Sequence, residues 1–333
     1  MPRRTAAPDR MRDQVVALAS MRDVHTAFDW FRKHESELFA EQLNLLKVPS
    51  PPFGEEKRAQ YLQQRFTAAG MSAVRLDEVN NVIGVLPGEV RDANGSVVLL
   101  TAHIDTVFPA GTQYEVVHSG NGFGTRIEAP GASDNAAGII ALVAMARVIT
   151  ELKLPHAADI ILVGNVGEEG EGDLRGMRHL FASAISKRIA YTLVIDGTGT
   201  EGIVTQALGS RRFEVTVHGP GGHSWQDYGR PNPINVLARA VSLFQDAPVP
   251  TTPRSSVNVG MISGGTSVNT IPESATMRVD IRSVVGDEIQ KLESALRRAV
   301  KLAASEQVRR TAAKRDQIRF EITQIGDRPA AQL

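Results

Sequence analysis

Cysteine is absent from this 333-residue chain, which excludes disulfides, thiolate metal sites and a cysteine nucleophile. Any strongly bound metal ion must therefore be held by histidine and carboxylate side chains. A net charge is lacking as well, because 37 Lys and Arg residues balance 37 Asp and Glu residues. Without excess positive charge the chain lacks long-range attraction for nucleic acid or an anionic membrane surface, and we expect neither as a partner.

Long hydrophobic runs are also missing. The longest apolar stretch, 136–149, is interrupted by Gly138 and Arg147 and is shorter than the roughly 20 residues that a helix needs to cross a bilayer. We therefore expect it to form a buried helix. The N-terminal segment contains basic residues but no continuous apolar core of a secretory signal. We predict a cytoplasmic protein whose residues 1–24 form a loose, disordered leader.

The chain is longer than the size at which a single hydrophobic core usually stops growing, so two domains are expected. Up to about residue 210, short apolar runs alternate with helical patterns, which predicts an α/β domain with a mainly parallel sheet at 25–210. From Gly209 onward the strands alternate apolar and polar residues, as half-solvated strands do. We predict a second, α+β domain at 211–325 and a final segment at 326–333.

The expected elements can be given by residue number. Two helices are predicted between Phe28 and Gly70, separated by a proline-rich loop. Further helices are predicted at 135–151, 176–189, 231–246 and 287–306. Strands are predicted at 81–86, 96–102, 159–165, 191–195, 211–218, 256–262, 274–282 and 318–323.

Histidine and acidic residues follow four predicted strands or open a helix beside them. They are His103 and Asp105 in LLTAHIDTV, Asp134 in GASDNAAG, Glu168 and Glu169 in GNVGEEGEGD, and Asp196 in LVIDG. Ligands bind outside the carboxyl ends of the strands in open α/β sheets, so we expect these side chains to converge. Each group alone is compatible with a helix cap, a turn or a solvated loop. Their occurrence together at strand ends favours a metal site.

Such a set of residues suits a dinuclear zinc site that hydrolyses an amide bond. Two zinc ions about 3.5–4 Å apart need a shared carboxylate and a bridging hydroxide to offset their repulsion, and Asp134 suits that bridge. Asp105 is expected to accept a hydrogen bond from the ring of His103 and to fix its tautomer. Of the pair Glu168 and Glu169, one carboxylate binds metal and the other takes a proton from the bridging water.

The motifs AHIDTVF, GASDNAAG, GEEGEGD, VIDG and GHS resemble those of the two-zinc exopeptidases and aminoacylases. This family includes peptidase T, carnosinase-type dipeptidases, acetylornithine deacetylase and succinyl-diaminopimelate desuccinylase, and the resemblance runs from about Phe28 onward. It implies two zinc ions per chain. The implied roles are one zinc on His103 and Asp196, the other on Glu169, Asp134 as the bridge and Glu168 as general base.

The same resemblance implies that the second domain is an inserted lid and dimerisation domain, and that 326–333 begins the return to the catalytic domain. His223 resembles the lid histidine that reaches the active site of the partner subunit in a homodimer and stabilises the oxyanion. Asn269 and Arg282 resemble the groups that bind the substrate carboxylate, a task that suits the planar fork of arginine. A cis peptide between Asp134 and Asn135 is also implied.

The sequence departs from the family at its C-terminal end. In the family, a histidine on the second zinc comes from a final catalytic segment that follows the lid, whereas no histidine follows His223 here. We expect either that this sequence is part of a longer protein or that a second polypeptide supplies the missing segment.

Three functions are compatible with these residues. The first is a metallo-exopeptidase acting on di- or tripeptides, an aminopeptidase similar to peptidase T, which the run GEEGEGDLRGMRHL favours. The second is an N-acyl-amino-acid hydrolase using the same metal ions. The third is a non-catalytic zinc-binding dimerisation module, against which Glu168 argues because a scaffold has no need of a general base.

Overall fold

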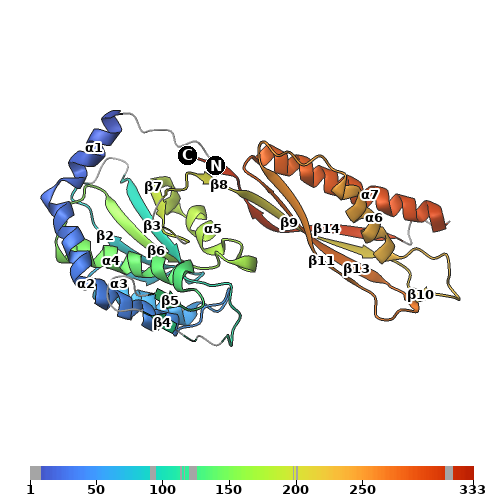
Figure 1. Cartoon of the computed structure of the whole chain (residues 1–333), viewed down its shortest axis with the longest axis horizontal. Helices are drawn as coiled ribbons and strands as arrows, with labels where there is room; N and C mark the ends of the chain where they lie inside the picture. Colours follow the sequence, from blue (N-terminus) through green and yellow to red (C-terminus); the bar gives the residue numbers. More distant parts are fainter. Residues whose placement is uncertain are drawn as a thin grey trace. The chain divides into compact units, whose positions relative to one another are not determined.

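The computed structural model describes residues 9–90, 95–112, 115, 117–119, 126–197, 199, 202–311 and 318–333. The chain divides into two compact units, Met1–Thr200 and Glu201–Leu333 (Figure 1). The division lies about ten residues before the boundary that the sequence pattern indicated. The first long strand of the second unit, β9 (Gly209–His218), begins close to the predicted position.

Three helices open the first unit: α1 (Asp9–Ala19), α2 (Arg22–Leu46) and α3 (Glu56–Ala68). The predicted loose leader up to residue 24 is wrong, since the structure has α1 and the start of α2 there. The physical reason is that 9–19 contains neither glycine nor proline and is rich in good helix formers. Val15, Val16 and Leu18 of α1 are nevertheless exposed.

The sheet of the first unit has the strand order β1-β2-β6-β3-β7. Its strands are β1 (Ser72–Leu76), β2 (Val82–Leu86), β3 (Val97–His103), β6 (Asp159–Asn165) and β7 (Ile189–Val194). β3 pairs in parallel with both β6 and β7, whereas β2 pairs antiparallel with β6 and with β1. Only β2 therefore runs against the others, which confirms the mainly parallel sheet.

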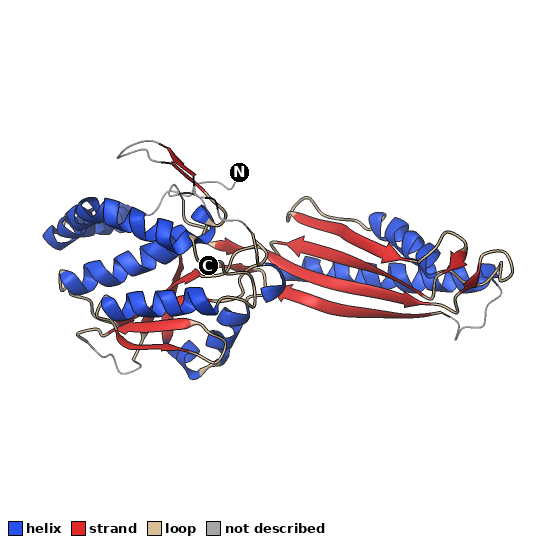
Figure 2. Cartoon of the chain, turned by 90° about the horizontal axis from the view of Figure 1, so that it is seen from below, coloured by secondary structure: helices blue, strands red, loops and turns tan. Residues whose placement is uncertain are grey.

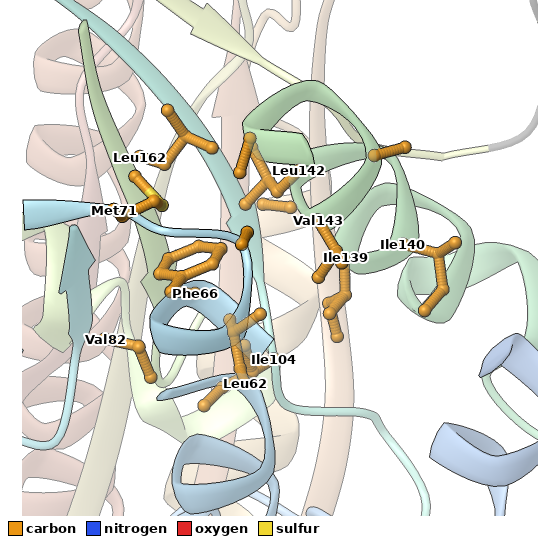
Figure 3. Packing of buried hydrophobic residues seen from close by; sticks show 14 of the residues in the cluster. Leu62, Phe66, Met71, Val82, Ile104, Ile139, Ile140, Leu142, Val143 and Leu162 are labelled. Atoms are coloured by element: carbon orange, nitrogen blue, oxygen red, sulfur yellow. The ribbon is translucent and has the colours of Figure 1, made fainter. Parts of the chain in front are cut away.

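Helices cover both faces of this sheet. On one face α2, α3 and α4 (Gly138–Glu151) enclose the larger core, in which Leu62 and Phe66 of α3 meet Val82 and Leu162 of the sheet (Figure 3). On the other face α5 (Arg175–Ala182) packs through Leu180. A helical stretch of the described residues, 132–151, is long and apolar enough to span a membrane, but 61% of its most apolar window is buried in the protein. It is the core helix that the sequence predicted.

β7 differs from the other strands of the sheet because it is largely uncovered. Tyr191, Leu193 and Val194 are all exposed, whereas most of β2, β3 and β6 is buried. The turn η3 (Ala184–Arg188) leads into β7. A short hairpin of β4 (Val117–Ser119) and β5 (Arg126–Glu128) completes the described strands of this unit.

The second unit is a four-stranded antiparallel sheet with helices on one face (Figure 2). The strand order is β11-β13-β9-β14, with β11 (Ser255–Gly264), β13 (Ser274–Ser283) and β14 (Arg319–Arg328). α6 (Pro233–Gln245) and α7 (Gly286–Thr311) pack on Phe213, Val215 and Val217 of β9. Arg212, Glu214 and Thr216 lie on the opposite face, as their alternation predicted.

Two small strand pairs complete the second unit. β10 (Gly222–His223) pairs with β12 (Thr270–Ile271), and β8 (Gln206–Ala207) pairs with β15 (Ala331–Gln332). Of the predicted final segment, 326–328 therefore completes β14, and 331–332 pairs within this same unit.

Candidate metal centre

The predicted metal-binding side chains lie at one edge of the sheet of the first unit. His103 is the last residue of β3, Glu168 and Glu169 follow β6, and Asp196 follows β7. Because β6, β3 and β7 are parallel neighbours, their carboxyl ends meet at the same edge. Asp134 comes from the short helical turn η1 (Ala132–Ala137), which leads into α4.

The side chains converge on His103, which is buried. Its Nε2 lies 2.8 Å from Oδ1 of Asp134 and 3.3 Å from Oδ1 of Asp196. The candidate ligand atoms of these three residues all lie within 4.8 Å of one another. The same holds for His103, Glu168 and Glu169. The expected convergence of histidine and four carboxylates is therefore present in one unit of the chain.

Asp105 supports this group through different atoms from those expected. Nδ1 of His103 lies 3.0 Å from the main-chain oxygen of Asp105 but 3.6 Å from its carboxylate, which is too long for a hydrogen bond. The carboxylate instead accepts hydrogen bonds from the main-chain N–H groups of Glu168, at 3.0 Å, and Glu169, at 2.8 Å. Asp105 thus joins the ends of β3 and β6, and its carbonyl orients the imidazole.

Asn135 connects the turn that carries Asp134 to the strand that precedes Asp196. Its amide donates to the carbonyl of Ile195 at 2.8 Å and its Oδ1 accepts from the N–H of Gly138 at 3.1 Å. A Cβ atom on Gly138 would lie 2.2 Å from Oδ1 of Asn135, so only glycine fits there. The peptide bond between Asp134 and Asn135 is cis, as the resemblance implied. The motif was recognised from the sequence, but this contact was not.

Two arginines also support the site, the buried Arg58 and the partly exposed Arg175, and neither was predicted from the sequence. Arg58 of α3 is fully buried and donates to the carbonyls of Val48 and Ile104. The bond to Ile104, the residue between His103 and Asp105, is 3.2 Å long. Arg175 forms two hydrogen bonds, of 2.9 and 2.7 Å, with Glu55. In the sequence these arginines resemble ordinary charged residues on a helix, and no local signal marks them.

The electrostatics of the group favour a cation. Burial together with the charges of Asp134 and Glu168 raises the pKa of Glu169 to about 7. Burial would lower the pKa of His103, but the bond to Asp196 and the negative charges of Asp105 and Asp196 outweigh it and raise the pKa to about 11. Carboxylates crowded in this way repel one another, and a divalent cation among them would relieve the repulsion.

The donor set fits zinc. Imidazole nitrogen and carboxylate oxygen are both zinc ligands, and bonds of about 2.0–2.2 Å in a tetrahedral arrangement place ligand atoms roughly 3.3 Å apart. The separation of 3.3 Å between His103 Nε2 and Asp196 Oδ1 equals that value, whereas Asp134 Oδ1 lies closer to the same nitrogen, at 2.8 Å. Both groups of candidate ligands found among the described residues contain His103. Because the two groups share this one histidine, two ions would have to be held mainly by the carboxylates, divided between them.

The three residues predicted to bind substrate lie in the second unit, at two separate places. His223 and Asn269 are neighbours, since the N–H of Ser224 donates to the carbonyl of Asn269 at 2.9 Å. Nδ1 of the exposed His223 accepts from the N–H of Trp225 at 3.2 Å, which leaves Nε2–H as a donor when the ring is neutral. Arg282 instead pairs with Asp280 at 2.6 Å, close to the other end of β13.

The separation along β13 decides which of these residues can act together within one chain. Arg282 comes eight residues after Ser274, where β13 begins shortly after β12. At about 3.4 Å per residue this is roughly 27 Å. One copy of the second unit therefore does not present all three side chains to the same small molecule.

A cluster of candidate metal ligands around the buried His103, at one edge of a mainly parallel sheet and followed by an antiparallel α+β unit, is consistent with a metallopeptidase. Two families match the chain: peptidase family M28 over residues 81–224 and the peptidase dimerisation domain over residues 205–308. Together the two matches span residues 81–308, and they support the resemblance of the motifs to the M20/M28-type exopeptidases.

Curated relatives are similar to the chain at low sequence identity. An uncharacterized Bacillus subtilis protein, YqjE, is 24% identical, and the alignment covers 80% of this chain and 72% of that protein. A probable carboxypeptidase of Aspergillus clavatus is 26% identical over 75% of this chain and 63% of its own length. The chain thus spans less than two thirds of the length of this carboxypeptidase.

Solved structures share the fold. Aminopeptidase PepT from Bacillus cereus superposes with a TM-score of 0.67 at 21% identity, covering 89% of this chain and 77% of that one. A tripeptidase from Staphylococcus aureus gives a TM-score of 0.69 at 21% identity, with coverage of 90% and 77%. A Bacillus subtilis protein described as a dinuclear metal-binding peptidase of the M20 family gives 0.61 at 16% identity, with coverage of 89% and 75%.

Proposed function

We propose that this protein is a zinc-dependent exopeptidase that removes a terminal residue from small peptides in the cytoplasm. Four side chains would hold two zinc ions: His103 and Asp196 on one ion, Glu169 on the other, and Asp134 between them. The observation that carries this proposal is the convergence of these ligand atoms at the carboxyl ends of three parallel strands. Zinc bound there would lower the pKa of water and polarise the carbonyl group of the substrate.

Glu168 is the group of this chain best placed to move the proton. Its main chain is fixed by the carboxylate of Asp105, and its side chain lies within reach of His103. The Glu168 carboxylate accepts a proton from the attacking water while the water oxygen forms a bond to the amide carbon. The C–N bond then breaks as Glu168 returns the proton to the leaving amine, so that one water is consumed for each amide bond.

We further propose that the working enzyme is a homodimer. Because Arg282 lies roughly 27 Å along β13 from the region of His223 and Asn269, these groups would meet one substrate only if two subunits contribute them. Nε2–H of His223 would donate to the oxyanion, and Arg282 would bind a substrate carboxylate. The match to the peptidase dimerisation domain at 205–308 supports this assembly.

A substrate panel tests the reaction. The purified protein, supplied with zinc, is incubated with free di- and tripeptides, with the same peptides blocked at either terminus, and with N-acetyl amino acids, and the products are identified by mass spectrometry. We expect hydrolysis of free peptides at a rate that depends on zinc. Loss of cleavage when the N-terminus is blocked identifies an aminopeptidase, and loss when the C-terminus is blocked identifies a carboxypeptidase. Cleavage of N-acetyl amino acids alone would instead establish the acyl-amino-acid hydrolase, and no cleavage of either class would contradict the proposal.

A further inference from the structure

Phe53 is exposed to solvent and has a backbone conformation that is unfavourable for phenylalanine. The residue lies in the loop between α2 and α3, its side chain is 62% exposed, and its φ is +67°. The left-handed region is costly for a bulky residue because Cβ crowds the neighbouring carbonyl oxygen. Neither exposure of an apolar ring nor positive φ favours phenylalanine for stability, and such combinations concentrate at functional sites.

The ring lies against Arg175, whose side chain also lies against the loop that carries the proposed general base. The guanidinium of Arg175 lies 4.7 Å from the centroid of the Phe53 ring. Arg175 is fixed by its two hydrogen bonds to Glu55, whose side chain is only 1% exposed. The side chain of Arg175 also lies against Gly167, where an added Cβ would meet Nη1 at 2.2 Å. The side chain of Arg175 therefore lies between the Phe53 ring and Gly167, the residue that precedes Glu168.

A second apolar side chain lies on the adjoining loop. The N–H of Thr106 donates to the carbonyl of Ser50 at 2.8 Å, which joins the loop that carries Phe53 to the segment that follows Asp105. Val107, the next residue, is 60% exposed. Two apolar side chains thus project from two loops that are anchored beside His103, Asp105 and Glu168.

We propose that Phe53 and Val107 form an apolar subsite that receives a bulky apolar side chain of the substrate next to the scissile bond. The proposal rests on the exopeptidase function proposed above and names its substrate class: small peptides with Leu, Phe, Met or a similar residue at that position. Burying such a side chain against the ring removes apolar surface of both molecules from water. The loop geometry is fixed before substrate binds, so little ordering entropy opposes the contact.

The decisive variant is Phe53→Gly, because it separates a functional role from a structural one. Glycine adopts φ of +67° without strain, so we expect the melting temperature to stay the same or to rise. We expect kcat/KM for peptides with Leu or Phe to fall about ten- to hundredfold, mainly through KM, while peptides of Gly and Ala change less than about threefold. Phe53→Tyr, which retains the ring, should keep the wild-type preference.

Phe28→Ala is the matched control, since it removes an exposed phenylalanine from α2 and should leave the preference unchanged. An unchanged ratio of Leu to Gly peptide hydrolysis in Phe53→Gly overturns the subsite, even though the wild type still cleaves peptides. A fall in melting temperature with an unchanged ratio also overturns it and assigns Phe53 a structural role. A change in native mass with an unchanged ratio assigns the ring to a protein contact instead. Failure of the wild type to cleave any peptide counts against the proposed function itself.

Discussion

The neighbouring glutamates Glu168 and Glu169 are both half-buried at the proposed centre, and different roles are proposed for them. The pKa of Glu169 is raised to about 7 by burial and by the charges of Asp134 and Glu168, so a bound cation would favour its charged form. We expect Glu168→Gln to keep its metal content and to lose at least about a hundredfold in kcat, because the amide cannot accept a proton. Steady-state kinetics together with metal analysis of the same preparation measure both quantities.

Glu171→Gln is the control for that substitution. It removes the same charge from the exposed part of the same loop, three residues beyond Glu168. We expect turnover close to that of the wild type. If Glu168→Gln retains turnover within about threefold of Glu171→Gln, the proton is carried by another group and the assignment of Glu168 is wrong.

At the scale of elements, the strands that build the site were predictable because each is a short apolar run. β6 has the predicted bounds of Asp159 to Asn165, and β3 begins and ends within one residue of its prediction. β1 was missed, since Ser72–Leu76 is short, largely exposed and interrupted by Arg75. The pairs β8 with β15 and β10 with β12 were missed because two-residue strands carry no periodicity.

The residues around the candidate ligands were less predictable than the ligands. His103 and Asp196 stand at the ends of apolar runs, and that position marks them in the sequence. The bond from Asn135 to Ile195 joins residues 60 positions apart through a main-chain oxygen, and nothing local indicates it. Asp105 was expected to act through its carboxylate on His103, but the fold directs that carboxylate to the Glu168 and Glu169 amides. Main-chain partners depend on how elements pack, which one sequence does not reveal.

The bond between Asn135 and Ile195 joins two elements and can be tested separately from catalysis. Asn135→Ala leaves the carbonyl of Ile195 and the N–H of Gly138 without these partners in a buried place. We expect a loss of about 2–4 kcal/mol in the unfolding free energy and a tenfold to hundredfold weaker zinc affinity. Urea denaturation without metal and competition with a chromophoric chelator measure the two effects.

Asn44→Ala is the control for Asn135→Ala. Asn44 is an exposed residue of α2 whose side chain accepts a bond from Lys47 at 3.3 Å, so its loss should cost little. Equal effects of the two alanine substitutions on zinc affinity would show that Asn135 does not align Asp134 with Asp196.

At the scale of the whole molecule, each unit has its own hydrophobic core. The first core lies between α2, α3, α4 and the mainly parallel sheet, and the second lies under α6 and α7. All six groups predicted at the metal centre belong to the first unit. The chain's two tryptophans distinguish the units, because Trp30 is 6% exposed in the first and Trp225 is 85% exposed in the second.

Metal removal should therefore destabilise one unit selectively. Zinc at one hundred times its dissociation constant stabilises the state that binds it by about 2.7 kcal/mol, and the second unit gains nothing if it holds no ion. We expect calorimetry to show two transitions, with a chelator lowering only the one that coincides with the change in Trp30 fluorescence. Added zinc should restore that transition in the wild type but not in Asp134→Ala, which lacks the proposed bridge between the ions. A chelator that shifted both transitions equally, or a full zinc response in Asp134→Ala, would place the metal elsewhere than at the edge formed by β6, β3 and β7.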